Sequence, residues 1–249
     1  MIEWLFGPPS GGVPPDPGTW LSGAELERLA RFRFEKRRSE WLLGRFTAKT
    51  LVVAALERRE KRPPSLSSIE IVPEPSGAPQ VRDVPSGMTL PLSVTISHSA
   101  GRALAALLFT DLPGTGHGTV GADLELVEPR SEGFIRDFLT ETERGEVASL
   151  PVPERPARAN GIWSAKEAVL KTLKLGLTVD TWRVECLLAP SEVQEPGPFA
   201  PEGPPWRRFS VRCAPEILPV TAGGNLFLGF WREEAGYVLT LAVAVTRRT

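Results

Sequence analysis

Two carboxylates, Asp123 and Glu125, lie two positions apart in an apolar stretch, Val120–Val127. Because side chains alternate along a strand, both would point to one face, with Leu124 on the other. Carboxylates on one face repel each other unless solvent or a cation separates them. Magnesium needs few protein oxygens, since water and substrate phosphates complete its shell. The pattern therefore allows either a magnesium site or the acidic outer face of a solvated edge strand.

A second charged pair, Glu167 and Lys171, lies four positions apart within Trp163–Lys171. A Glu–Lys pair in this order on a helix surface contributes only about 0.2–0.5 kcal/mol. The alternative is functional, with Glu167 as a third metal ligand or general base and Lys171 as a phosphate ligand. Apolar residues at helical spacing predict that a different side of this helix faces the core. These residues are Ile162, Val169 and Leu173.

One of the two histidines, His98, lies between Ser97 and Ser99 where a predicted strand enters a hairpin. The backbone N–H groups of a tight turn and an imidazole can together bind a phosphate, and a structural turn histidine is the alternative. A Ser-His-Asp triad is excluded because no Gly-x-Ser-x-Gly turn is present. The other histidine, His117, lies in a glycine-containing loop that leads into a strand, which argues against a nucleotide-binding loop.

The formal charge of the chain is −1, but positive charge gathers between Glu25 and Arg62, where 12 Lys or Arg stand against 6 Glu. The nearly neutral total argues against a general nucleic-acid binder. A local positive region suits a small polyanion. For any single arginine in this region, such as Arg28, a solvated helix face is the alternative.

The composition, with 41% hydrophobic and 24% charged residues among 249, is typical of a globular protein. The longest apolar run, Ala103–Phe109, is far shorter than the roughly 18 residues of a membrane span. The start, Met1–Asp16, lacks the basic and apolar regions of a secretory signal. Cys186 and Cys213 have no CxxC spacing, so we expect neither a zinc site nor a disulfide framework. A cytoplasmic protein with no membrane partner is the expectation.

Local patterns predict helices and strands along the whole chain. Ser22 and Glu25 form a capping-box pattern that opens a helical region toward Arg59, and Thr140 with Glu143 opens a short helix. A Pro-rich segment, Ala189–Pro205, is predicted to be an irregular surface insertion. The other predicted elements are a helix at Arg158–Lys174 and strands at Ile2–Leu5, Ile69–Val72, Leu92–Ser97, Ala103–Phe109, Val120–Val127, Thr181–Leu187, Arg207–Arg212, Asn225–Trp231 and Tyr237–Val245.

The chain contains a weak internal repeat. Gly44–Lys49 is similar to Gly161–Lys166, and a hairpin turning at Ala-Gly follows each copy, at Ala100-Gly101 and at Ala235-Gly236. Chance can produce one six-residue similarity, but the order of elements agrees as well.

We therefore predict an α+β fold of two similar halves in a pseudo-twofold arrangement, 1–112 and 113–249, the second carrying the acidic residues. A groove between such halves is a natural ligand site, and it makes a monomer sufficient.

Taken together, these patterns resemble the Sfp-type 4′-phosphopantetheinyl transferases, a family that activates carrier proteins. The resemblance runs from the Arg28 helix to Leu175. Its most specific parts are the G-x-D-x-E strand at Gly121–Glu125 and the W-x-x-K-E-A-x-x-K helix at Trp163–Lys171, about 40 residues apart as in the family. The Ile96-Ser97-His98 hairpin is a third match.

The resemblance implies a role for individual residues. Asp123, Glu125 and Glu167 would bind Mg²⁺, and Lys171 would reach the pyrophosphate. The coenzyme A contacts would be Arg28 at the 3′-phosphate, Ser97 and His98 at the phosphates, and the backbone of Gly77. Ala78 stands where the family often has a lysine.

The implied reaction is attack by a serine of an apo acyl or peptidyl carrier protein on the β-phosphate of coenzyme A, releasing 3′,5′-adenosine bisphosphate. Glu167 would accept the serine proton, and Lys171 and His98 would stabilise the leaving group. Fatty-acid, polyketide and nonribosomal-peptide carriers, and hence secondary-metabolite biosynthesis, are all compatible with these residues. The alternative is a non-catalytic coenzyme A or carrier-protein binding module derived from such an enzyme.

Overall fold

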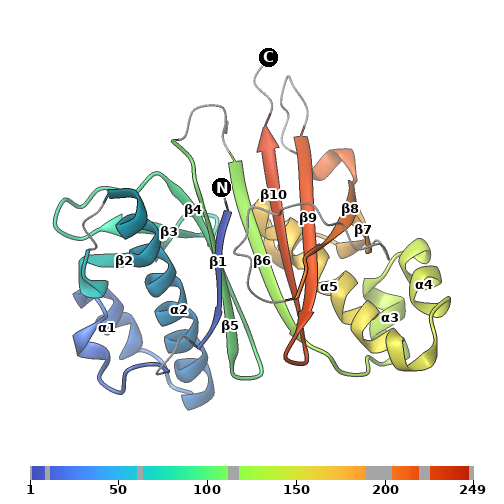
Figure 1. The fold of residues 1–249 in the computed structure, drawn as a ribbon, viewed down its shortest axis with the longest axis horizontal. Helices are drawn as coiled ribbons and strands as arrows, with labels where there is room; N and C mark the ends of the chain where they lie inside the picture. Colours follow the sequence, from blue (N-terminus) through green and yellow to red (C-terminus); the bar gives the residue numbers. More distant parts are fainter. Residues whose placement is uncertain are drawn as a thin grey trace. The chain divides into compact units, whose positions relative to one another are not determined.

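The computed structural model describes residues 2–8, 12–60, 64–111, 118–188, 204–218 and 225–246. The chain divides into two compact units, unit 1 at Met1–Asp111 and unit 2 at Leu112–Thr249 (Figure 1). Both units combine helices with antiparallel strands, so the α+β class is confirmed. The loop around His117 and nearly all of the Pro-rich segment Ala189–Pro205 lie outside the described residues.

Unit 1 has one long helix, α2, packed on a three-stranded sheet in the order β1-β5-β4. Beside β4 lies a separate two-stranded pair, β2-β3. Small and branched residues of α2, including Ala48 and Val52, pack against Val94 of β4 and Leu107 of β5 to form the core. The elements are β1 (Ile2–Gly7), α1 (Gly23–Leu29), α2 (Glu35–Glu60), β2 (Ile69–Pro73), β3 (Pro79–Asp83), β4 (Leu92–Ser99) and β5 (Arg102–Phe109).

Unit 2 has a five-stranded antiparallel sheet in the order β6-β10-β9-β8-β7, and α5 packs against β6, β10 and β7. Its elements are β6 (Gly118–Leu126), α3 (Glu132–Phe138), α4 (Glu141–Ala148), α5 (Arg155–Thr172), β7 (Val184–Leu188), β8 (Arg207–Cys213), β9 (Asn225–Glu234) and β10 (Tyr237–Thr246). Short 3-10 turns lie at Pro17–Thr19, Leu66–Ser68, Val152–Glu154, Gly176–Thr178, Thr181–Arg183 and Pro215–Ile217. None of the described helices is long and apolar enough to cross a bilayer.

The two units repeat one order of elements. In each, a long helix is followed by a two-stranded pair and then by a hairpin, and the last strand pairs with the first strand of its unit. Both hairpins turn on two residues with positive φ, Ala100 (44°) and Gly101 (80°) in one, Ala235 (51°) and Gly236 (82°) in the other. Two positive φ angles produce the turn that matches the twist of the strands.

Most predicted strands have bounds within three residues of the observed ones. The helical region predicted from Ser22 toward Arg59 is present as two helices, because the chain leaves helical geometry between α1 and α2. This break folds α1 back, so that Leu29 is buried with Trp20 and Phe46 of α2. Hydrophobic burial of this cluster outweighs the helix propensity of the connecting residues.

Two short elements, β3 and α3, were not predicted, since five and seven residues are too few for a periodic pattern to stand out. The expectation that α5 has one core-facing stripe is also incomplete. Ile162 and Val169 are buried as expected, but Lys166 and Ser164 on other sides of the helix are buried as well. Between the sheet and the segment of α3 and α4, α5 is covered on nearly every side.

Candidate functional site

The strand β6 and the helix α5 approach each other closely at Gly121. A methyl group at this position would lie 1.9 Å from the carbonyl oxygen of Ala168, a distance that no side chain tolerates. One step along the same face, Thr119 Oγ1 donates a hydrogen bond of 2.9 Å to the Thr172 carbonyl. The face that carries Asp123 and Glu125 is therefore covered by α5, and it is not the solvated outer face of an edge strand.

Asp123 lies under this helix with 3% of its side chain exposed, and its partner is Lys171 of α5. The Lys171 ammonium lies 2.7 Å from Asp123 Oδ1 and 2.9 Å from the Ala122 carbonyl oxygen. Its distance to Glu167 Oε2, the partner expected for a helix-surface pair, is 4.0 Å. Lys171 thus pairs with a carboxylate of the neighbouring strand, and it does not form an isolated ion pair on the helix surface.

Glu167 faces the same cluster. Burial and the negative charges of Asp123 and Glu125 raise the pKa of Glu167, Lys171 opposes them, and the resulting pKa is about 7. The structure therefore brings together the three carboxylates and the lysine singled out in the sequence, within one electrostatic environment. A carboxyl group with a pKa near neutrality can give or take a proton under physiological conditions.

Glu125 is held by two donors. The indole Nε1 of Trp163 lies 3.1 Å from Glu125 Oε1, and an Arg130 Nη2 lies 2.7 Å from Glu125 Oε2. Burial and the charge of Asp123 raise the pKa of Glu125, while Arg130 and Trp163 act in the opposite direction. Arg130 is in turn anchored by Asn160 of α5, whose Oδ1 accepts a hydrogen bond of 2.6 Å.

Arg130 and Asn160 were missed in the sequence because neither belongs to a periodic pattern. Trp163, the first residue of the W-x-x-K-E-A-x-x-K helix, is buried. The structure shows that it packs edge-on against Phe134 and Phe138, and it also donates to the acidic cluster. A core residue can thus orient a functional carboxylate.

The chemistry of this donor set fits a hard divalent cation, since buried carboxylates that raise one another's pKa gain most from a shared positive ion. The geometry is not that of a finished metal centre. In the described part of the chain, no group of three or more His, Cys, Asp or Glu side chains is arranged to hold a metal ion. Lys171 and Arg130 lie where they neutralise these carboxylates, and a metal ion would compete with Lys171 for Asp123.

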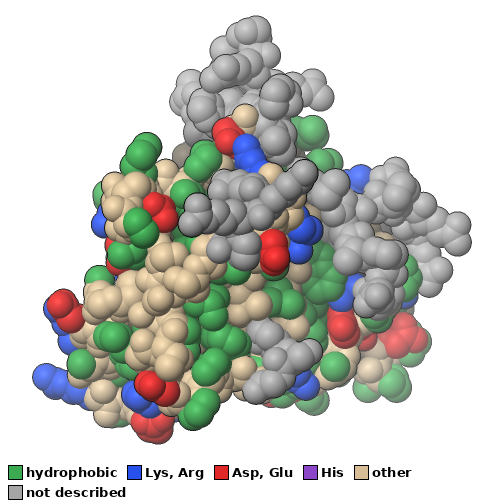
Figure 2. Space-filling model, turned by 60° about the vertical axis from the view of Figure 1, so that its left-hand side comes forward, with side chains coloured by type: hydrophobic (Ala, Val, Ile, Leu, Met, Phe, Trp, Pro, Cys, Tyr) green, Lys and Arg blue, Asp and Glu red, His purple; other side chains and the backbone are tan. Residues whose placement is uncertain are grey.

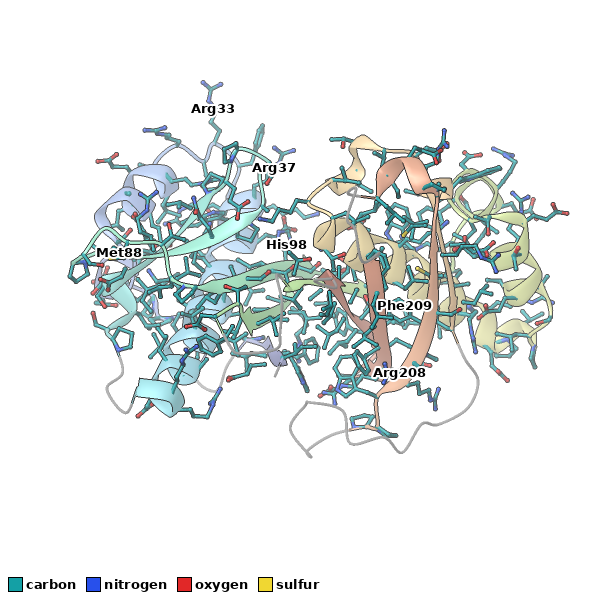
Figure 3. The ribbon with its side chains drawn as sticks, turned by 90° about the horizontal axis from the view of Figure 1, so that it is seen from above. Arg33, Arg37, Met88, His98, Arg208 and Phe209 are labelled. Carbon is teal, nitrogen blue, oxygen red and sulfur yellow. The ribbon has the colours of Figure 1, made fainter. Side chains whose placement is uncertain are left out.

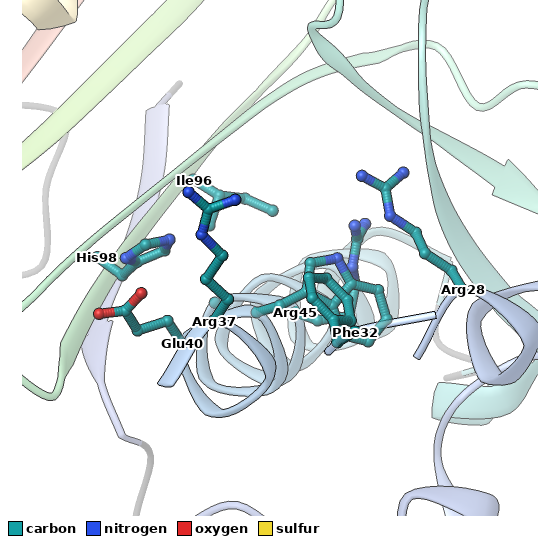
Figure 4. A pocket seen from close by; sticks show the side chains of 9 residues that line it. Arg28, Phe32, Arg37, Glu40, Arg45, Ile96 and His98 are labelled. Atoms are coloured by element: carbon teal, nitrogen blue, oxygen red, sulfur yellow. The ribbon is translucent and has the colours of Figure 1, made fainter. Parts of the chain in front are cut away.

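A second feature lies within unit 1, where a hollow of about 430 Å³ opens between α2, the end of α1 and β4 (Figure 4). Its volume is in the usual range for small-ligand sites. Three arginines and a histidine line it, with Glu40 as the acidic lining residue, so the hollow is suited to an anion. The lining residues are Arg28, Phe32, Arg37, Glu40, Trp41, Gly44, Arg45, Ile96 and His98.

Arg45 forms the buried wall of this hollow. Its Nη1 donates a hydrogen bond of 2.7 Å to the Ile71 carbonyl, and its guanidinium stacks 4.8 Å from the centre of the Trp41 ring. Burial lowers the pKa of Arg45, Glu25 opposes this and Arg28 adds to it, so that the resulting pKa is about 10. Arg45 therefore stays charged at neutral pH.

His98 and Arg28, two of the predicted coenzyme A contacts, both line this hollow. Ser97 lies on the opposite face of β4 from His98 because neighbouring strand residues alternate, and it is buried there. Gly77 lies in the exposed turn between β2 and β3 with φ of 86°. Neither Ser97 nor Gly77 lines the hollow.

Arg37 and Arg45 were not assigned a role from the sequence. Their spacing was the available signal, because Arg37, Trp41 and Arg45 recur every four residues and so lie on one face of a helix. The other arginines of the basic region do not all reach the hollow, since Figure 3 shows Arg33 pointing away from unit 1. On the face shown in Figure 2, basic and acidic side chains are interspersed.

Comparisons with known proteins place these features in context. No curated protein sequence matches the chain. The ACPS–coenzyme A complex of Chronobacterium ammoniagenes is similar at 17% identity and a TM-score of 0.40, covering 53% of this chain and 98% of that one. The holo-[acyl-carrier-protein] synthase of Thermotoga maritima is similar at 19% identity and a TM-score of 0.36, covering 52% and 64%. Residues 119–212, which include Asp123, Glu125, Glu167 and Lys171, match the family model of the 4′-phosphopantetheinyl transferase superfamily.

Proposed function

We propose that this protein transfers the 4′-phosphopantetheine group from coenzyme A to a serine of an apo acyl or peptidyl carrier protein. The observation that carries the proposal is the meeting of three carboxylates and Lys171 where β6 packs against α5. All four residues lie in the segment that matches the transferase superfamily. Such a cluster suits a reaction in which two negatively charged phosphates must be approached by a nucleophile.

Asp123, Glu125 and Glu167 would hold Mg²⁺, which when bound supplies positive charge to the pyrophosphate. Glu167 would take the proton of the carrier serine, directly or through a water molecule. Lys171 donates to the phosphate oxygens of the leaving group. The serine Oγ forms a bond to the β-phosphorus, and the bond from that phosphorus to the bridging oxygen breaks. 3′,5′-Adenosine bisphosphate leaves.

The basic hollow of unit 1 binds the phosphorylated nucleotide end of coenzyme A. Arg28, Arg37 and Arg45 provide positive charge, and His98 lines the same hollow (Figure 4). Arginine suits this task because its planar group donates two parallel hydrogen bonds to one phosphate. Ser97 and Gly77 contact coenzyme A outside this hollow.

The carrier partner belongs to a fatty-acid, polyketide or nonribosomal-peptide system, the last two within secondary-metabolite biosynthesis. We also propose that the protein is a monomer, that it works in the cytoplasm, and that it binds neither nucleic acid nor a membrane. Its support is the near-neutral charge and the presence of metal-type and anion-type sites within a single chain.

The test is to incubate the protein with coenzyme A, Mg²⁺ and several apo carrier proteins, and then to measure the intact mass of each carrier. A mass gain of one phosphopantetheine group is expected, and it should disappear with EDTA or with Asp123→Asn. If no carrier gains mass while coenzyme A still binds, the protein is the non-catalytic binding module instead.

A further inference from the structure

A buried ion pair anchors α5 directly beside the proposed catalytic residues. Lys166 Nζ lies 2.6 Å from Glu143 Oε2, and both side chains are 0% exposed. Lys166 also donates to the Phe138 carbonyl at 2.8 Å. Glu143 accepts from the backbone N–H groups of Thr140 at 2.7 Å and Cys186 at 2.8 Å. One pair thereby joins α3, α4, β7 and α5.

Unit 1 contains the same arrangement. Lys49 Nζ lies 2.5 Å from Glu25 Oε2, again fully buried. Glu25 accepts from the backbone N–H groups of Ser22 at 3.0 Å and Ile71 at 3.1 Å, in the same helix-capping box and on the corresponding strand. Because Lys49 and Lys166 end the two copies of the six-residue repeat, the pair belongs to the repeated fold.

The acidic cluster is not repeated. The residue after Lys166 is Glu167, whereas the residue after Lys49 is Thr50. Lys171 corresponds to Ala54, five residues beyond the lysine in each helix. The two pairs therefore have the same structural role, and only the pair in unit 2 holds a helix that carries residues of the acidic cluster.

We propose that Lys166, clamped by Glu143, is a positioning residue that sets the rotation of α5 and so presents Glu167 and Lys171 to the carboxylates of β6. Successive helix residues point about 100° apart, so fixing the direction of Lys166 fixes that of Glu167. Lys166 touches neither Asp123 nor Glu125 in this role. It acts through the helix. The inference rests on the proposed function, because it concerns the metal-binding cluster of that function.

The experiment measures Mn²⁺ binding by the full chain, from the loss of the free-ion signal in electron paramagnetic resonance. Mn²⁺ is used as a probe for the same oxygen ligands as Mg²⁺. The variant is Lys166→Met combined with Glu143→Gln, which removes both charges and keeps similar side-chain lengths. Replacing both partners of a buried pair avoids leaving one charge without compensation. Residues that orient metal ligands typically change affinity by 10- to 100-fold, so the Mn²⁺ dissociation constant should rise at least tenfold.

The matched control is Lys49→Met combined with Glu25→Gln, which removes the same pair from unit 1. It should lower the melting temperature to a similar extent and leave the Mn²⁺ dissociation constant within about twofold of the original, because it leaves the contacts of Lys166 and Lys171 in unit 2 unchanged. Lys166→Met alone is the second variant. The Glu143 carboxyl group then keeps both backbone donors, Thr140 and Cys186, so this variant should fold even where the double variant does not, with weaker Mn²⁺ binding.

Unchanged Mn²⁺ affinity in the folded unit 2 variants, with only a lower melting temperature, would overturn the inference. An equal loss of affinity in both double variants would overturn it too, since the effect would then be general loosening. The variant Asp123→Ala separates a failure of the proposed metal site from a failure of the positioning role of Lys166. If the original protein binds Mn²⁺ no better than Asp123→Ala, the proposed metal site itself is wrong, whatever Lys166 does.

Discussion

Lys171 illustrates how the neighbour of a charged residue decides its role. Its ammonium is 2.7 Å from Asp123 on β6 and 4.0 Å from Glu167 on its own helix. A helix-surface pair would be exposed and nearly neutral in energy, whereas an ammonium a quarter exposed beside several carboxylates can stabilise a developing phosphate charge.

Lys171→Ala should lower kcat by about 100-fold or more, because removing one donor to a developing oxyanion costs roughly that much. The surface-pair interpretation predicts a loss of only about 0.2–0.5 kcal/mol in stability. Carrier modification measured against time, together with the melting temperature, distinguishes them. Normal kcat with a small shift in melting temperature would contradict the catalytic role.

Glu167 makes metal binding sensitive to pH. Its pKa, raised by burial and by Asp123 to about 7, means that the carboxyl group is largely protonated below that pH. A metal must displace this proton, so Mn²⁺ affinity should increase as the pH rises toward 7 and level off above it. Titration of Mn²⁺ at several pH values measures this. In Glu167→Gln the dependence near pH 7 should vanish, and its persistence would show that another group titrates.

At the scale of elements, the site depends on how closely β6 and α5 approach. Gly121 allows this approach because it has no Cβ, and the hydrogen bond from Thr119 to Thr172 fixes the same contact from the next position on that face. The carboxylates of Asp123 and Glu167 are then within reach of the Lys171 ammonium. A change in the separation of these two elements would alter stability and site together.

Gly121→Ala should destabilise the protein by about 3 kcal/mol or more, since the added methyl would overlap backbone atoms of α5 that cannot move aside. Chemical denaturation measures the free energy of unfolding. Gly145→Ala is the control, because this exposed position within α4 has no atom within 4 Å of an added Cβ. There, alanine should stabilise by about 0.4–1 kcal/mol. Equal effects at both positions would contradict the close approach.

At the scale of the whole molecule, two units with the same order of elements carry different charged residues. In unit 1 the helix face toward β4 carries Arg37 and Arg45, and in unit 2 the helix carries Glu167 and Lys171 toward β6. The repeat position of Arg45 is occupied in unit 2 by Ile162, which is fully buried. In the proposed function, one scaffold thus serves an anion site in unit 1 and a cation site in unit 2.

Arg37→Ala should weaken coenzyme A binding by about 10- to 100-fold, the range expected for a hydrogen bond between charged groups. Isothermal titration with coenzyme A measures this. Arg33→Ala is the control, because Arg33 is equally exposed but points away from the hollow (Figure 3). The anion-site assignment would be wrong if both variants bound coenzyme A as tightly as the original protein.

The sequence by itself determined the features that depend on a few neighbouring residues. Both capping boxes, at Ser22 and Thr140, and the hairpin turn at Ala100-Gly101 were predicted and are confirmed. So is the common face of Asp123 and Glu125, since β6 is a strand and strand side chains alternate. These patterns are local, and their geometry follows from cap chemistry and from the period of the element.

Tertiary structure decided what covers each face. Only the packing of α5 showed that the Asp123 face is buried, that Lys171 pairs across elements, and that Arg130 holds Glu125. The break between α1 and α2 arose in the same way, because burying Leu29 against Phe46 involves residues far apart in the chain. Local patterns specify which side chains share a face. The partner of that face depends on hydrophobic packing between distant segments, which no short sequence pattern contains.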